Sequence, residues 1–485
     1  MIGNPIRTIA QPFSVGRVLA SWFAVIVTAI IAGALAAGRA DAALGKTPAL
    51  LLLAVLVGGA FLGVFLYLGP TAVLIWPVAA TGGYLLQIPR SHAVITFDRV
   101  WIGGLLAYVA VNPRRTPRTA ATRLLAFALL WLVVSFGARS VATSFSLYGP
   151  VRTWIDAIVL PAILFIACER YCLVNADRMR RLAGSLMIAG GVLGAIGIAE
   201  RIWGFELATL TGGSVRYDAN IDTTRISGPY PAPEPYALSL AICFAATLYW
   251  ILSRKRGSGY GWGIALASVQ VTAIALALFR AGWIAAILVA IASFGYRPGR
   301  FGRTFALTGL VAVLAVAATT QLESNKTVAS RVNNTSNING RLATYKEGFE
   351  IFRTAPTFGI GVNKYNSVAQ ARSPEVVQGV PAVNWPHSSY FGLLAEQGAV
   401  GFFPLLLLSY AVWRLLAALR AASFRSREAT VLLATVTGAV LAYLIMSLTL
   451  TMLPYEASNT FFAAFLGGAC GRLDSLEREA PKTAS

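Results

Sequence analysis

The stretch PAVNWPHSSYFGLLAEQGAVG, residues 381–401, joins the two kinds of sequence from which this chain is built. It ends a long polar segment, contains His387, which is one of only two histidines, and continues directly into an apolar run. A run of roughly 20 apolar residues is long enough to cross a bilayer as an α-helix. The stretch therefore predicts a histidine at a membrane surface, immediately before a transmembrane helix.

The composition of the whole chain also indicates a membrane protein. Of its 485 residues, 56% are hydrophobic and only 12% are charged, whereas about a quarter are charged in an average soluble domain. Apolar runs recur from end to end, which predicts an all-α polytopic membrane protein in which residues 1–485 form a single membrane domain. We expect about 12–14 transmembrane helices among the runs 18–37, 49–68, 70–88, 93–111, 124–142, 152–174, 182–200, 232–252, 262–279, 281–296, 304–320, 398–416, 430–452 and 459–471. The weakest are 93–111, which contains Asp98 and Arg99, and the short run 459–471.

Cysteines and the N-terminus add two smaller predictions. The four cysteines all lie in or beside apolar runs: Cys168, Cys172, Cys243 and Cys470. This placement favours buried core residues over disulfides or metal ligands. Arg7 and Arg17 precede the first run without a convincing cleavage site, so we expect a retained first helix.

Short loops rich in arginine and lysine predict the orientation. When the spans alternate across the membrane, these loops share one side with both termini, and that side is expected to be the cytoplasm. They comprise residues 114–123, 178–181, 254–256, 297–303 and 414–427. The net charge of +20 is then mostly a sign of topology, and we expect no nucleic-acid partner.

The same alternation places two long segments on the outer side, residues 201–231 and 321–396. Loops of this length are usually functional or disordered. The second contains apolar residues at helical spacing, which predicts an amphipathic helix with Asn339 as N-cap and Pro356 just after its end. We expect this helix to lie over a cavity as a lid, with an apolar face made of Leu342, Tyr345, Phe349 and Phe352.

Histidine gains or loses a proton near neutral pH, so His387 can act as a general base on a hydroxyl group. From its position alone, an interfacial histidine bonded to a carbonyl is the favoured interpretation. Arg225 precedes a span, Arg280 stands between two apolar runs, and Arg341 opens the amphipathic helix. A single arginine in such a place also fits contact with lipid headgroups. Three arginines with a histidine fit a diphosphate site, because guanidinium groups bind phosphate oxygens through paired hydrogen bonds.

Four stretches together resemble the O-antigen ligase and polysaccharide polymerase superfamily. They are RISGPYPAPEPYA (225–237), FRAGW (279–283), GFEIFRTAPTFGIGVNKY (348–365) and HSSYFGLLAEQGAVGF (387–402). The resemblance covers about residues 200–405. It implies a bacterial inner-membrane glycosyltransferase of GT-C type that moves a glycan from undecaprenyl diphosphate to an acceptor on the periplasmic side. It also implies an enzyme without a metal or cofactor, and the sequence contains no Asp-x-Asp motif and no His/Cys cluster.

The resemblance assigns roles by position. His387 matches the family's basic histidine, Arg225 and Arg280 match its diphosphate-binding arginines, and Arg341 matches a loop arginine more loosely. Ser388 stands where the family often has asparagine. Further candidates with weaker support are Tyr390, Glu396, Glu234 and Lys346.

The predicted reaction is therefore a metal-independent, inverting transfer of an undecaprenyl-diphosphate-linked oligosaccharide in contact with membrane lipids. A polymerase would add the glycan to another lipid-linked unit, whereas a ligase would add it to an acceptor such as lipid A core; the sequence slightly favours the polymerase. A transporter or lipid flippase is the alternative class, to which Asp156, Glu169 and the many spans would be suited. The chain lacks the internal symmetry expected of many transporters.

Overall fold

The computed structural model describes residues 63, 65, 67–83, 87–88, 95–111, 113–114, 116–145, 149–205, 207, 217–218, 223–254, 260–295 and 336–479. The chain divides into two compact units, Met1–Ala72 and Val73–Ser485. The predicted spans 18–37 and 304–320, and most of 49–68, lie outside the described residues, as do Arg7 and Arg17.

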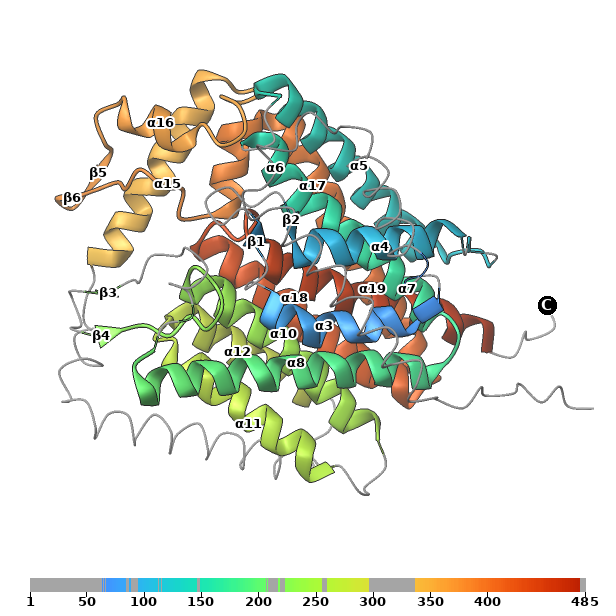
Figure 1. The fold of residues 1–485 in the computed structure, drawn as a ribbon. Helices are drawn as coiled ribbons and strands as arrows, with labels where there is room; N and C mark the ends of the chain where they lie inside the picture. Colours follow the sequence, from blue (N-terminus) through green and yellow to red (C-terminus); the bar gives the residue numbers. More distant parts are fainter. Residues whose placement is uncertain are drawn as a thin grey trace, which may run out of the picture. The chain divides into compact units, whose positions relative to one another are not determined.

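Helices make up nearly all of the regular structure (Figure 1), which confirms the all-α prediction. They are α3 (Thr71–Gly83), α4 (Phe97–Val111), α5 (Ala120–Thr143), α6 (Pro150–Trp154), the π-helical turn η2 (Ile155–Val159), α7 (Leu160–Cys172), α8 (Ala176–Trp203), α10 (Pro233–Ser253), α11 (Tyr260–Leu276), α12 (Arg280–Phe294), α15 (Ser336–Thr354), α16 (Tyr365–Gln370), α17 (Ser389–Ser423), α18 (Arg427–Thr449) and α19 (Glu456–Glu479). Three antiparallel two-residue ribbons pair β1 (Gln87–Ile88) with β2 (Ile95–Thr96), β3 (Tyr217–Asp218) with β4 (Thr223–Thr224), and β5 (Val376–Val377) with β6 (Val380–Pro381).

Six of these helices are long and apolar enough to cross a membrane, counted over the described part of the chain only. They are Ala120–Thr143, Pro150–Cys172, Ala176–Trp203, Pro233–Ser253, Ser389–Ser423 and Arg427–Thr449. The helices α3, α11 and α12 are apolar but shorter. The two weakest predicted spans do form helices, α4 and α19, but neither belongs to the six. The protein is a multi-pass helical membrane protein.

Small residues let the helices approach closely. A Cβ atom added to Gly467 or Gly471 of α19 would stand within 2.3 Å of the carbonyl oxygens of Phe165 or Glu169 in α7. Two glycines four residues apart lie on one helix face, and this arrangement brings helix backbones together in membranes. The four cysteines are free and buried, as predicted.

The helices have two distinct ends, which we call the basic end and the loop end. At the basic end, Arg114 pairs with Glu169 and with Asp474 (2.6 Å), and Arg118 pairs with Glu169 at 2.7 Å. Nearby, Arg472 pairs with Glu428 at 2.8 Å, and Glu428 accepts a hydrogen bond from Tyr249. These contacts place the segment after α4, the end of α7, the start of α18 and the later part of α19 at one end of the helices.

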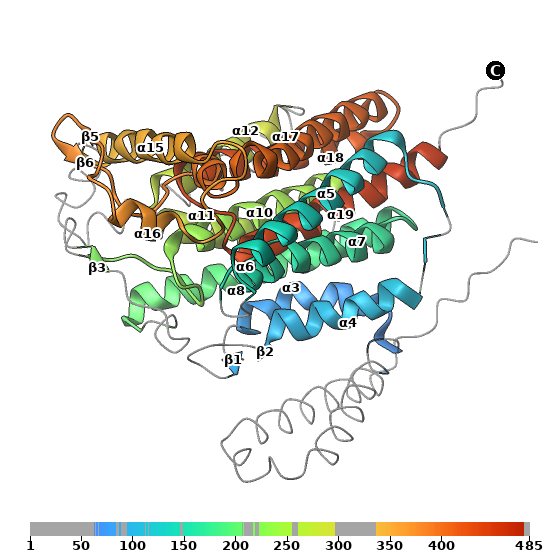
Figure 2. The ribbon, with the colours of Figure 1, turned by 90° about the horizontal axis from the view of Figure 1, so that it is seen from above.

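The loop end is the opposite one, where α10, α12, α17 and α19 begin and α18 ends. Figure 2 shows α15, α16 and the β5–β6 ribbon grouped there, with α17 and α18 running away from them. The predicted outer loop 321–396 contributes its described part, from residue 336 onward, to this end.

One detail of the predicted amphipathic helix is wrong. α15 begins at Ser336, so Asn339 lies inside the helix and is not its N-cap. Leu342 and Phe349 are nearly half exposed, whereas Ala343 and Ile351 are completely buried. α15 thus packs through its smaller side chains and leaves large apolar ones outward, which suits a helix beside a membrane surface.

The ion pairs at the basic end give a stability prediction. Replacing Glu169 with Gln removes the carboxylate that Arg118 and Arg114 share inside the structure, leaving a poorly compensated buried charge. We expect a loss of about 3 kcal/mol of stability, measured as a lower unfolding midpoint of the detergent-solubilised protein. Glu350→Gln is the control, since its pair with Arg353 is exposed and worth under ~1 kcal/mol. Equal midpoints for the two variants would contradict this account.

Candidate active site

The segment that carries His387 is fastened to the end of α18 on both sides. Before it, the Thr451 hydroxyl donates to the Pro386 carbonyl. After it, the Ser389 amide donates to the Leu450 carbonyl at 3.2 Å, and the Ser389 hydroxyl accepts from the Met452 amide at 2.7 Å. His387 is itself partly buried. Hydrogen bonds at Pro386 and Ser389, on either side of His387, therefore fix the position of this residue.

α15 is attached to the same place. The Tyr345 hydroxyl donates to the Leu448 carbonyl at 2.7 Å, and the Tyr345 ring stacks on Phe391 with centroids 5.0 Å apart. Arg341 lies one helical turn earlier on the same face. Burial raises the pKa of the Tyr345 phenol, and the positive charge of Arg341 partly opposes that rise. Arg341 therefore lies near the end of α18.

Arg280 is the first residue of α12, as the sequence predicts. A Cβ atom on Gly438 of α18 would stand 2.9 Å from the Cα of Val289, so these two antiparallel helices touch there. Arg280 is nine residues before Val289, and Ser447 is nine residues after Gly438. Because every helical residue advances by the same rise, Arg280 lies at about the same height along the helices as Ser447, at the loop end.

Arg225 opens a tight loop that a buried carboxylate holds. Glu200, near the end of α8, accepts hydrogen bonds from the amides of Ser227 at 3.0 Å and Gly228 at 2.7 Å. Glu200 was not among the residues predicted from the sequence. Its signal was a carboxylate at the end of an apolar run, a costly position that usually has a purpose.

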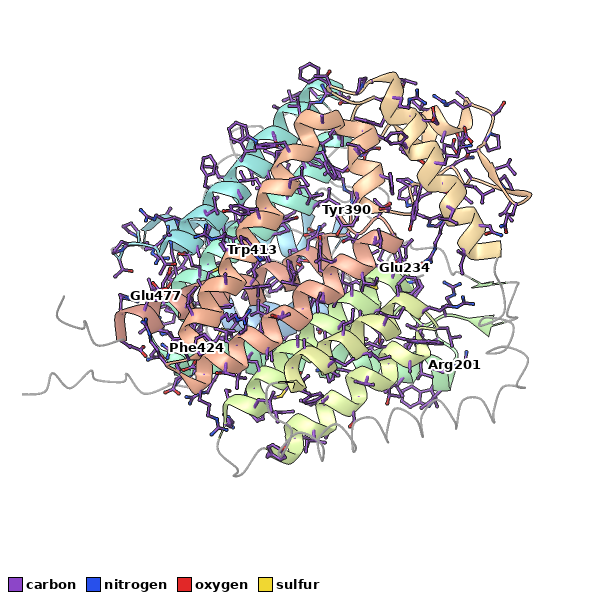
Figure 3. The ribbon with its side chains drawn as sticks, turned by 180° about the vertical axis from the view of Figure 1, so that it is seen from behind. Arg201, Glu234, Tyr390, Trp413, Phe424 and Glu477 are labelled. Atoms are coloured by element: carbon purple, nitrogen blue, oxygen red, sulfur yellow. The ribbon has the colours of Figure 1, made fainter. Side chains whose placement is uncertain are left out.

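The four weaker candidates divide into two groups. Glu234, in the first turn of α10, is buried one turn before Ala237, whose Cβ lies 2.9 Å from the position of a Cβ on Gly282 in α12. Tyr390 lines the cavity described below, and Figure 3 shows both residues toward the end of the helices opposite Glu477.

Glu396 and Lys346 have structural partners instead. The Glu396 carboxylate accepts the Tyr365 amide at 3.1 Å. Lys346 is exposed and pairs with Glu375 at 2.7 Å, beside the β5–β6 ribbon. Both therefore hold the outer loop together.

A kink in α17 anchors this loop to the helices. Gly398 adopts φ +66°, which interrupts the helix and frees backbone groups on both sides. The turn 356–361 uses them: Ile360 N–H donates to the Ala395 carbonyl at 3.0 Å, and Ala399 N–H donates to the Pro356 carbonyl at 2.8 Å. The turn 356–361 is therefore docked on the kink in α17.

An apolar cavity of about 180 Å³ lies among α5, α7, α17, α18 and α19. Leucine, valine and phenylalanine side chains line most of it, including Leu132, Leu393 and Val440. Ser389, two residues after His387, and Ser447, level with Arg280, also line it. The cavity therefore extends from the hydrophobic interior to the start of α17, next to the segment that carries His387.

Together these features define a multi-pass helical membrane protein whose candidate site lies at one end of the helices, under a fastened outer loop. Residues 264–407 match the family model described as O-antigen ligase. The match covers these residues only, and over them it confirms the resemblance to the O-antigen ligase and polymerase superfamily. His387, Arg280 and Arg341 lie inside the match, whereas Arg225 and Glu234 lie before it. No curated protein matches the chain.

The glycine contact at the kink gives a prediction. A Cβ on Gly398 would stand 2.5 Å from the Thr357 carbonyl, so Gly398→Ala must displace the docked turn. We expect the outer loop to be cleaved at least about tenfold faster in limited proteolysis of membranes, because local docking weakens by more than ~1.4 kcal/mol. Gly379→Ala is the control, since Gly379 also has positive φ but open space around its Cβ position. Equal cleavage of the two variants would assign the effect to backbone strain alone.

Glu200 gives a second prediction. Glu200→Ala leaves two buried amides without their acceptor and releases the loop that begins at Arg225. Bonds to charged groups are worth about 1.5–3 kcal/mol each, so we expect glycan product in cells to fall more than tenfold. Glu200→Gln, which keeps an acceptor oxygen, should recover part of it. A Glu200→Ala variant with unchanged product at equal protein level would refute this role.

Proposed function

We propose that this protein is a surface-polysaccharide polymerase that uses undecaprenyl-diphosphate-linked oligosaccharide at the periplasmic face of the bacterial inner membrane. The family match supports glycan transfer of the O-antigen ligase and polymerase type. The observation that carries the proposal is the attachment of both the His387 segment and α15 to the end of α18, beside an apolar cavity.

The arginines would bind the donor. Guanidinium groups hold phosphate oxygens through paired hydrogen bonds, so Arg280, Arg341 and Arg225 would grip the diphosphate and neutralise its charge as it leaves. The reaction proposed needs no metal for this reason. The polyprenyl chain would enter laterally between helices, and the apolar cavity suits its first units.

His387 would act as the general base. It would take the proton from the acceptor hydroxyl as that oxygen attacks the anomeric carbon, while the bond from that carbon to the diphosphate breaks on the opposite face. A single displacement inverts the anomeric configuration. α15, fastened through Tyr345, would exclude water that would otherwise hydrolyse the donor.

The orientation follows the same proposal. The basic end, with its arginine-rich segments, would face the cytoplasm together with both termini, and the loop end would face the periplasm. A ligase that attaches the glycan to lipid A core or another acceptor is the alternative, since it would use the same donor and base.

The test replaces the base and one anion-binding group. We expect His387→Ala to lower product at least about 100-fold, the lower range for loss of a general base, and Arg280→Lys to lower it roughly 10- to 100-fold, because the paired hydrogen bonds are lost while the charge stays. Lys364 is exposed and lies in the same outer loop, 321–396, as His387. Lys364→Ala is therefore the control and should leave product unchanged.

The intermediates distinguish the two readings. In cells expressing His387→Ala at the normal level, single lipid-linked repeat units should accumulate if the protein is a polymerase. Accumulated long lipid-linked polymer would indicate the ligase. Full product from both His387→Ala and Arg280→Lys would overturn glycan transfer by these residues.

A further inference from the structure

A second cavity, of about 560 Å³, opens at the basic end between α3, α8 and α10. It is lined by three arginines, Arg180 and Arg181 near the start of α8 and Arg254 just after α10, with Asp177 as the acidic residue among them. It lies at the opposite end of α8 from Glu200 and is separate from the candidate active site. Three guanidinium groups against one carboxylate give this cavity an excess of positive charge.

The arginines are only partly satisfied by the protein. Arg180 pairs with Asp177 at 2.9 Å through one terminal nitrogen. Its Nε is shielded from solvent and has no hydrogen-bond partner among the residues that the structure describes. The Arg254 guanidinium lies over the Trp250 ring, 4.0 Å from the centroid. These groups keep donors available for an anion with several oxygens.

The cavity changes from charged to apolar along its length. Asp177 and Ile188, which both line it, are eleven residues apart on α8, a distance of roughly 16 Å. Trp250 lies between the arginines and the apolar part, which includes Val78 and Ile188. Gly184 leaves room there, because a Cβ on it would stand 3.2 Å from the Trp250 Nε1. Tryptophan at such a boundary is typical of the membrane interface.

We propose that this cavity binds an anionic phospholipid from the leaflet that meets the basic end. The headgroup phosphate would lie among Arg180, Arg181 and Arg254, and the upper acyl chain would pack on Val78 and Ile188. A free phosphate ion would match the charges but leave the apolar part unused. The lipid would bridge three helices, of which α3 and α8 already touch through the Ser185 hydroxyl and the Leu74 carbonyl.

The test uses the full-length protein in neutral detergent, titrated with phosphatidylglycerol or phosphatidylcholine and followed by native mass spectrometry. Wild-type protein should retain phosphatidylglycerol in preference to phosphatidylcholine. The triple variant R180Q/R181Q/R254Q should bind phosphatidylglycerol about fivefold more weakly for each arginine removed. The matched control R420Q/R425Q removes exposed arginines of the same end and should bind like wild type.

A second variant protects the test against a folding failure. Ile188→Trp keeps all three arginines but fills the apolar part at a half-exposed position, and it should also lower retention of phosphatidylglycerol. Three outcomes would overturn the proposal: equal loss in the R420Q/R425Q control, equal retention of the two lipids by wild type, or displacement of phosphatidylglycerol by inorganic phosphate alone.

Discussion

The last turn of α18 ends in carbonyl groups that its own helix cannot use, and the candidate site is built on them. A helix leaves its final carbonyls without intrahelical partners, and close to a membrane little water is available to replace them. The Tyr345 hydroxyl of α15 donates a hydrogen bond to the Leu448 carbonyl, and the Ser389 hydroxyl donates one to the Leu450 carbonyl. One requirement, that backbone polar groups be satisfied, thus brings α15 and the histidine segment to the same point.

The hydrogen bonds that hold the other loops also satisfy backbone polar groups at helix ends. The kink at Gly398 opens α17, and the turn 356–361 closes the exposed backbone with its own amides and carbonyls. In the loop after Arg225, the Glu200 carboxylate accepts hydrogen bonds from two backbone amides that lie in no helix or strand. Functional residues on loops need a rigid scaffold, and here that scaffold is a set of helix ends.

Much of this could be predicted from the sequence. The run 232–252 corresponds to Pro233–Ser253, and 124–142 corresponds to Ala120–Thr143, because hydrophobicity alone decides which segments can lie in a bilayer. The family resemblance placed His387 and Arg280 next to helix starts, where the structure has them. These features depend on local composition, which a sequence displays directly.

The features that the sequence did not reveal depend on distant partners. Gly398 is the first residue of the predicted span 398–416, and nothing in the local sequence indicates a kink there. Only the docked turn explains its positive φ. The packing of α15 is a second example: Ala343 and Gly348 allow close packing, whereas Leu342 faces out. Glu200 acts on amides 27 and 28 residues away, a relation that no spacing rule contains.

The charges on α6, η2 and α7 bear on the transporter alternative. Asp156 is bonded to Arg99 through both oxygens, at 2.7 and 2.6 Å, near the loop end. Glu169 is bonded to Arg114 and Arg118 at the basic end. The residues between them, 157–168, carry no charge and span roughly 20 Å. A transporter needs ionisable groups near the midplane that change partners. Here each carboxylate is held by arginines at one end of an uncharged segment, and this arrangement supports chemistry at the rim over passage through the membrane.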